Sequence, residues 1–260
     1  MFSKRNYYLL KLQYLGFRYH GWQKQPQGKT VEYMVERTIK HIVKHDRFKL
    51  LASGRTDAKV SANTAFVELF MKDEKIDPEL FLPLLNENLP QDILALEVSQ
   101  VDASFNIIDA PSEKEYVYLF CFGKKSHPFA APFMVNMMGD LDLGLMQQAA
   151  SLFEGTHDFR AYTYKPNEHT NTTGTVTAAS IEPNTLFTAN FFPEQSYVFR
   201  VRGKGFKRHQ IRLMMGVLFD LGRRKCDLDF IKKTLEPDNT IKLEHIAKAS
   251  GLILNDVVLE

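Results

Sequence analysis

Cysteine is scarce in this sequence, because only Cys121 and Cys226 occur among its 260 residues. The two stand far apart and form no CxxC pair, which excludes a disulfide framework and a thiolate metal site. No apolar run approaches the roughly 20 residues that a membrane-crossing helix needs. The first residues also lack the apolar core of a signal peptide. We therefore expect a cytoplasmic protein that makes no membrane contact.

Acidic residues are missing from two stretches of the chain, before Glu32 and over residues 199–213. The net charge is only +2, so the local clustering of cations matters more than the total. Clustered cations favour a polyanion such as RNA as the partner, although each cluster could also be an ordinary solvated face. The clusters are Lys4, Arg5, Lys11, Arg18, Lys24 and Lys29 in the first stretch, and Arg200, Arg202, Lys204, Lys207, Arg208 and Arg212 in the second.

The first half of the chain alternates strands and helices with short loops. Residues 7–14 predict a strand with Tyr8, Leu10, Leu12 and Tyr14 on its inner face. Thr30 is placed to cap a helix that follows it, and a second helix starts at Asp77-Pro78 with Leu80, Phe81, Leu84 and Leu85 facing inward. Further strands are predicted at 48–52, 65–70 and 93–98.

The second half repeats this logic. It predicts strands at 116–122, 175–181 and 197–202, and helices at 143–153 and 209–221. No linker rich in Pro, Gly or Ser separates the halves. We therefore expect an α+β protein of two subdomains, residues 1–108 and 109–260, that share one sheet or one cleft.

The loop Ser53–Ala62 lies between two predicted strands and places Asp57 two residues after Arg55. Gly54 permits a tight backbone there. A single aspartate in such a loop is more often a turn former that bonds to its own backbone than a catalytic group. The loop alone therefore does not establish a function.

Further motifs accompany this loop in a fixed order. They are Gly21-Trp22-Gln23-Lys24-Gln25-Pro26, Leu89-Pro90-x-Asp92-Ile93, Lys114-x-Tyr116-x-Tyr118, Gly155-x-His157-Asp158-Phe159, and Phe206 with His209-Gln210-Ile211-Arg212. In these motifs the chain resembles the tRNA pseudouridine synthase A family over nearly its whole length. The resemblance implies the pseudouridine synthase fold, in which two similar mixed α/β halves have antiparallel sheets that meet at a central cleft. The first half then carries the Asp57 loop, and the second carries the Tyr116 strand and the Arg212 helix.

The resemblance also implies a reaction, in which the bond from C1′ to uracil N1 is cleaved and the base is rejoined through C5. Neither a cofactor nor a metal is expected. Asp57 would be the catalytic carboxylate, as nucleophile or as base. Arg212 would pair with it and favour its ionised form. Tyr116 would lie against the flipped uracil, although an inward-facing strand tyrosine fits the pattern equally well.

A second set of residues is implied to bind the substrate. Arg55 would contact phosphate and fill the space left by the flipped base, although a surface salt bridge is the plainer interpretation of that arginine. The implied substrate is tRNA, modified at uridines 38 to 40 of its anticodon stem-loop by a homodimeric enzyme. The set comprises Arg55, Lys59, Tyr118, Arg202, Lys204, Lys207 and His209.

Three positions depart from the family pattern near the substrate. Lys59 replaces a glycine, Ser61 a histidine and Ile108 an arginine. These departures support an alternative, an RNA-binding protein of the same fold with lost or altered catalysis. A carboxylate-based nucleosidase is a weaker alternative, because no second carboxylate in the motifs is placed to assist the leaving base.

Overall fold

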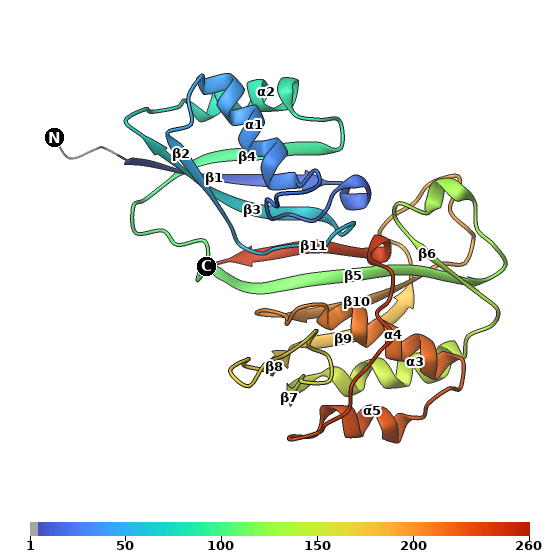
Figure 1. The fold of residues 1–260 in the computed structure, drawn as a ribbon. Coiled ribbons are helices and arrows are strands. Elements are labelled where there is room, and N and C mark those ends of the chain that lie inside the picture. Colours follow the sequence, from blue (N-terminus) through green and yellow to red (C-terminus); the bar gives the residue numbers. More distant parts are fainter. Residues whose placement is uncertain (1–4) are drawn as a thin grey trace. The chain divides into compact units, whose positions relative to one another are not determined.

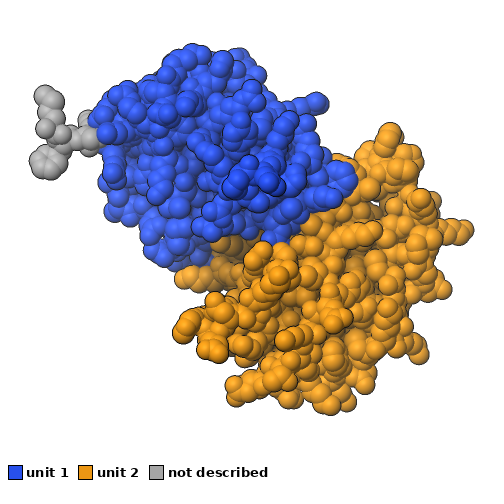
Figure 2. Space-filling model, in the orientation of Figure 1, with its two compact units in different colours: residues 1–112, 254–260 blue, residues 113–253 orange. Residues whose placement is uncertain are grey.

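The computed structural model describes residues 5–260, so that Lys4 of the first cation cluster lies outside the described residues. The chain forms two compact units (Figure 2). Unit 1 comprises the chain up to Ser112 together with Leu254–Glu260, and unit 2 comprises Glu113–Ile253. Each unit packs helices on a sheet, which confirms the α+β class predicted from the sequence.

Unit 1 is built on a sheet with the strand order β4-β1-β3-β11, and β2 also pairs with β3. β1 runs antiparallel to both of its neighbours, and β2 runs antiparallel to β3. The chain order of the elements is β1 (Arg5–Tyr14), the short 3-10 helix η1 (Gly16–Arg18), α1 (Val31–Val43), β2 (Phe48–Ala52), β3 (Ser61–Lys72), α2 (Pro78–Asn88), β4 (Ile93–Val101) and finally β11 (Leu252–Leu259).

The helices α1 and α2 lie on one face of this sheet (Figure 1). Alternate residues of β1 point into that core, and Tyr8, Leu10 and Leu12 are fully buried, as predicted. Thr30 caps α1 as predicted, because its side-chain oxygen accepts a hydrogen bond from the backbone N–H of Tyr33. The sequence pattern alone therefore places this face of the core correctly.

The inner face predicted for α2 is wrong at two of its four positions. Phe81 and Leu85 are buried, but Leu80 is 67% exposed and Leu84 is 43% exposed. Residues four apart share a face of a helix, whereas neighbours in sequence are turned about 100° from each other. The core therefore takes the pair Phe81 and Leu85 and leaves the adjacent leucines toward solvent.

Unit 2 is built on a sheet with the strand order β5-β10-β9, and β6 pairs in parallel with β5. A separate two-stranded ribbon joins β7 and β8. The chain order is β5 (Pro111–Gly123), η2 (Pro128–Ala130), β6 (Val135–Met138), α3 (Leu143–Ala150), η3 (Ser151–Phe153), β7 (Gly155–Asp158), β8 (Thr173–Val176), β9 (Ala178–Pro183), β10 (Tyr197–Gly203), α4 (Gln210–Gly222), α5 (Leu228–Leu235) and η4 (Ala249–Gly251).

The strand predicted over 175–181 is in fact two strands, because the chain breaks between β8 and β9 at Thr177. The backbone N–H of Thr177 donates to the carbonyl oxygen of Arg202, and its hydroxyl donates to a carboxylate oxygen of Glu113. These bonds replace a regular strand pairing at that residue. The segment then serves two sheets, which a continuous alternating pattern does not reveal.

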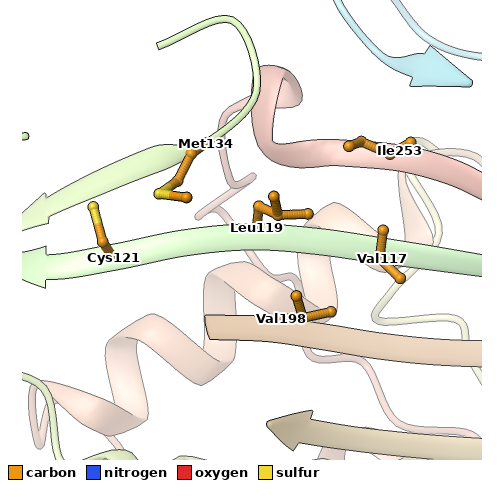
Figure 3. Packing of buried hydrophobic residues seen from close by; sticks show 6 residues of the cluster. All are labelled: Val117, Leu119, Cys121, Met134, Val198 and Ile253. Carbon is orange, nitrogen blue, oxygen red and sulfur yellow. The ribbon is translucent and has the colours of Figure 1, made fainter. Parts of the chain in front are cut away.

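Buried hydrophobic residues of β5 and of the neighbouring segments pack together in unit 2 (Figure 3). Val117, Leu119 and Cys121 are alternate residues of β5, so they share one face of the strand. Val198 of β10 lies opposite Leu119 in the register. Burial raises the pKa of the Cys121 thiol. This residue is therefore an apolar core group with little thiolate character.

One charged residue is buried in unit 1, on β3. Glu68 is only 1% exposed, and one of its carboxylate oxygens accepts a hydrogen bond from the backbone N–H of Ile107. The other oxygen, Oε1, has no hydrogen-bond partner among the described residues. Burial raises the pKa of this carboxyl group, because it disfavours the ionised form.

Replacing Glu68 by glutamine should stabilise the protein at neutral pH. A carboxyl group whose pKa is higher in the folded state favours folding most below its unfolded pKa, and this contribution is lost as the pH rises through its folded pKa. The gain for Glu68→Gln should therefore be present at pH 7 and close to zero near pH 3. Urea unfolding of both proteins at the two pH values measures it. An equal difference at both pH values would show that Glu68 does not titrate as described.

Candidate active site

The loop that carries Asp57 joins β2 to β3 in unit 1 and is fixed by the residue before the aspartate. Thr56 is buried, and its hydroxyl lies 2.8 Å from the hydroxyl of Tyr14, within hydrogen-bond distance. Its carbonyl oxygen accepts a hydrogen bond of 3.0 Å from the backbone N–H of Trp22. The side chain and backbone of Thr56 are thus both held, and the backbone position of Asp57 follows from them.

Gly21 explains why the motif before α1 accompanies this loop. A Cβ atom on Gly21 would lie 2.8 Å from the carbonyl oxygen of Thr56, and the φ angle of Gly21 is +90°. Both the space and the backbone angle therefore require glycine. The carbonyl oxygens of Gly21 and Trp22 then accept from the first N–H groups of α1, at Val31 and Glu32.

The far end of the loop is held in a similar way. The backbone N–H of Gly16 donates to the hydroxyl of Ser61 at 2.9 Å, and a Cβ atom on Gly16 would lie 1.9 Å from the carbonyl oxygen of Val60. Ser61, one of the departures from the family pattern, therefore has a structural contact within unit 1. The backbone N–H of Val60 donates to the carbonyl oxygen of Asp57, which closes a tight turn.

The side chains on the loop differ in exposure. Arg55 and Lys59 are exposed, and Asp57 is half-buried. Lys59 has a φ angle of +68°, which a residue with a Cβ atom adopts at a cost. Its ammonium group lies 6.0 Å from the centre of the Phe17 ring. Ile108, the third departure, is 55% exposed on the segment that follows β4.

Tyr116 lies on β5 in unit 2, opposite Val201 of β10 in the register. It is half-buried, and its ring packs edge-to-face against the ring of Phe206 at 5.4 Å between centroids. Phe206 belongs to the turn that connects β10 to α4. One side of the Tyr116 ring is thus supported by an aromatic residue, an arrangement that suits a ring used for stacking.

Arg212 lies in the first turn of α4 and is half-buried. Its guanidinium Nε donates to the carbonyl oxygen of Ala247 at 2.8 Å, and the backbone N–H of Ala247 donates to the carbonyl oxygen of Arg212 at 3.0 Å. These reciprocal bonds fix the stem of the side chain against the chain segment before β11.

Tyr118 is fully buried in unit 2. Its hydroxyl donates to the carbonyl oxygen of Lys248 at 2.7 Å, and its ring packs against Phe219 of α4. Desolvation raises the pKa of this hydroxyl. These contacts favour a packing role for Tyr118 over the substrate contact that the resemblance implies.

Arg202 belongs to an ion-pair network on the sheet of unit 2. It shares the buried carboxylate of Glu115 with Arg200, at 2.6 Å from each arginine. Arg200 also pairs with Glu182 at 2.7 Å. Acidic residues from β5 and β9 thus offset part of a cation run that contains no acid in the sequence.

The other cations of that run lie between β10 and α4. Lys204 is exposed, Lys207 is half-buried, and desolvation lowers the pKa of the Lys207 ammonium group. His209 precedes α4 with a φ angle of +58°, so the helix begins one residue later than predicted. The backbone N–H of Lys207 donates to the side-chain oxygen of Gln210 at 2.7 Å, which closes the turn in front of the helix.

Among residues 5–260, no three histidine, cysteine, aspartate or glutamate side chains gather as a metal site requires. The ring nitrogen Nε2 of His45 lies within hydrogen-bond distance of a carboxylate oxygen of Glu74. Within the same residues, no helix has both the length and the apolar character to cross a membrane.

Tyr164 contacts a predicted site residue, although the sequence analysis did not single it out. It lies six residues after Asp158, outside any predicted element, and its ring packs against His209 at 4.5 Å between centroids. The only sequence signal was an aromatic residue beside a cation, Tyr164-Lys165.

Comparison with known proteins identifies the family of this chain. Residues 12–108 and 149–258 match the family described as tRNA pseudouridine synthase. A relative named tRNA pseudouridine synthase A from Shouchella clausii is 32% identical over 247 residues, which cover 95% of this chain and 91% of that protein. Proteins of the same name from Acetivibrio thermocellus and Thermodesulfovibrio yellowstonii are 31% and 29% identical and match 95% and 96% of this chain, and 97% and 98% of their own lengths.

The α+β fold and the matched regions define a member of an isomerase family. The chain belongs to the tRNA pseudouridine synthase family. The family resemblance recognised from the sequence motifs is confirmed.

The left-handed backbone angle of Lys59 leads to a prediction about the free energy of unfolding of two variants. Lys59→Gly and Lys59→Ala remove the same charge and the same contact with Phe17, but only glycine adopts the φ angle of +68° without strain. The glycine variant should be more stable than the alanine variant by about 1 kcal/mol. Chemical denaturation of the two full-length variants measures this difference. Equal stabilities would show that the turn relaxes when the lysine is replaced.

Proposed function

We propose that this chain converts uridine to pseudouridine in tRNA, at positions 38 to 40 of the anticodon stem-loop, with Asp57 as the catalytic carboxylate. The observation that carries the proposal is the anchoring of Thr56 by two hydrogen bonds, because this fixes the backbone beside the half-buried Asp57. The names of the relatives support tRNA as the substrate. Loops held by rigid elements are where catalytic groups are found most often.

The reaction breaks the bond between C1′ and N1 of the uracil and forms a bond between C1′ and C5. N1 gains a proton and C5 loses one, so that no redox change occurs and no cofactor is required. Asp57 assists either by attacking the ribose or uracil as a nucleophile or by removing a proton as a base. Both roles require the ionised carboxylate.

Tyr116 and Arg212 are proposed to complete the chemistry. The ring of Tyr116 stacks on the flipped base, supported from one side by Phe206. Arg212 supplies a positive charge that favours the ionised form of Asp57. Its fixed stem, bonded to Ala247, reduces the side-chain entropy lost when the guanidinium engages a carboxylate.

The proposed substrate contacts come from basic side chains that are exposed or half-buried. Arg55 and Lys59 flank Asp57 on its loop, and Lys204, Lys207 and His209 precede α4. Their charges favour binding to phosphate groups of RNA. Arg202 contributes less to phosphate binding in this proposal, because Glu115 engages its guanidinium. We propose that the substrate is tRNA in the cytoplasm.

Asp57→Asn should abolish turnover and leave tRNA binding largely unchanged, because the change removes the charge while keeping the size of the side chain. Incubation with unmodified tRNA, followed by mapping of pseudouridine, measures turnover, and a fluorescence titration measures binding. Asp102→Asn, at an exposed aspartate of the same unit, is the matched control and should retain full activity. Turnover by Asp57→Asn near that of the parent would identify another carboxylate as the catalytic one.

The same mapping distinguishes the proposal from its alternative. Pseudouridine in the anticodon arm of tRNA supports the proposed reaction and target. Tight binding of tRNA without any pseudouridine would instead support an RNA-binding protein of this fold. Modification of ribosomal RNA alone would refute the proposed substrate.

We also propose that the protein is a homodimer, as the family resemblance implies. β4 is the edge strand of the unit 1 sheet, and it carries Leu94 and Leu96 with exposed fractions of 42% and 40%. An edge strand with exposed leucines suits contact with a second copy of the chain. Light scattering should give twice the chain mass of 29.9 kDa. A Leu94→Lys, Leu96→Lys double variant should shift the mass toward one chain, whereas a parent of one-chain mass would refute the dimer.

A further inference from the structure

An aromatic ring surrounded by cations lies in unit 2 beside the start of α4. The ring of Tyr164 packs against the imidazole of His209, with 4.5 Å between centroids and 31° between planes. The guanidinium carbon of Arg208 lies 5.0 Å from the centre of the Tyr164 ring, and the ammonium nitrogen of Lys165 lies 5.3 Å from it. We refer to these four residues as the Tyr164 cluster.

The cluster is tied to the elements that carry Tyr116 and Arg212. The backbone N–H of Tyr164 donates to the carbonyl oxygen of Arg208 at 2.9 Å. Arg208 follows Phe206 by two residues, so their Cα atoms are at most about 7 Å apart. Phe206 packs on Tyr116, and Arg212 follows His209 by one turn of α4. The cluster is therefore a neighbour of the proposed uracil-binding ring.

The cations of the cluster differ from the other cations of the same run. Arg200 and Arg202 direct their guanidinium groups to the carboxylates of Glu115 and Glu182. Arg208 and Lys165 instead lie over an aromatic face, and both are exposed. A guanidinium over a ring is a planar surface on which a further planar group can stack. The positive charges favour a planar group that belongs to a polyanion.

We propose that the Tyr164 cluster binds a nucleotide of the RNA next to the one that is flipped, by stacking of its base and by contact with its phosphate. Tyr164 and His209 set the plane of the stack, and Arg208 presents its guanidinium to the base. Lys165 neutralises a phosphate. Base stacking on aromatic and guanidinium groups tolerates any base, so the cluster contributes affinity and position rather than sequence choice.

This inference rests on the proposed function only for the identity of the RNA. Within that function it adds a binding subsite that includes Tyr164, a residue outside the catalytic set of Asp57, Tyr116 and Arg212. It also assigns Arg208 a role that its place in a charged run did not specify.

The test measures binding of fluorescently labelled, unmodified tRNA over a range of salt concentrations. Tyr164→Leu removes the ring and should weaken binding roughly 5- to 100-fold, with an unchanged salt slope. Tyr164→Phe keeps the ring and should bind within about twofold of the parent. Arg208→Gln should weaken binding, because it removes the guanidinium that meets the base. Lys165→Gln should lower the log-log salt slope by roughly 0.7, because one phosphate-directed cation is lost.

Lys233→Gln is the matched control for charge, because Lys233 is an exposed cation on α5, outside the cluster. It should leave both affinity and slope unchanged. Thermal melting verifies that Tyr164→Leu folds. If it does not fold, Arg208→Gln tests the inference independently, because Arg208 is exposed. Parent-like affinity in a folded Tyr164→Leu variant, or in Arg208→Gln, would overturn the inference.

The outcomes separate this inference from the proposed function. A parent that forms pseudouridine in tRNA while the cluster variants bind like the parent overturns the inference alone. If the parent binds RNA but forms no pseudouridine, and both cluster variants bind RNA more weakly than the parent, the inference is supported and the proposed reaction is refuted. A parent that binds no RNA overturns both.

Discussion

The position of the proposed catalytic carboxylate depends on the buried threonine that precedes it. Thr56 is bonded through its hydroxyl to Tyr14 and through its carbonyl oxygen to Trp22. These partners come from the end of β1 and from the segment before α1, so the loop is held by two parts of unit 1 that are distant from it in sequence. Because the contact at Gly21 leaves no space for a Cβ atom, the same packing explains the glycine of the motif. Thr56, Gly21 and Trp22 therefore position the loop through contacts within unit 1.

Charge in this chain must be judged in space and not along the sequence. The run 199–213 contains no acid, yet its first two arginines share the buried carboxylate of Glu115. In the amino-terminal run Arg18 pairs with Asp92, and Lys24 pairs with Glu36 at 2.7 Å. Strand pairing and helix packing bring these acids to the cations from later parts of the chain. The cations left for a polyanion are thus a subset, and the part around Arg208 is distinguished by its aromatic neighbours.

Regular patterns allowed much of the fold to be predicted from the sequence. The alternation in β1 and the cap at Thr30 were correct, because each depends on residues close together in the chain. Leu80 and Leu84 were misplaced, because apolar character alone cannot determine which side of α2 meets the sheet. The strand β11 joins the sheet of unit 1 although it ends the chain, and no local pattern indicates a pairing over that distance. For the candidate site, the motifs predicted Asp57, Tyr116 and Arg212, whereas Tyr164 becomes visible only when two loops are brought together.

Two residues near the proposed catalytic residues have strained backbone angles. Lys59 and His209 both have φ angles in the left-handed region, +68° and +58°, although neither is glycine. Lys59 lies two residues after Asp57 in unit 1, and His209 lies three residues before Arg212 in unit 2. Each such conformation costs on the order of 1 kcal/mol or more, and strain of this kind concentrates at functional sites. A glycine would remove the strain but also the side chain, which is a lysine ammonium group in one case and an imidazole ring in the other. Five further non-glycine residues among those described have left-handed backbone angles, and one of them, Lys44, simply ends α1. The proposed binding roles of Lys59 and His209 therefore depend on their places beside Asp57 and Arg212, and not on the backbone angle.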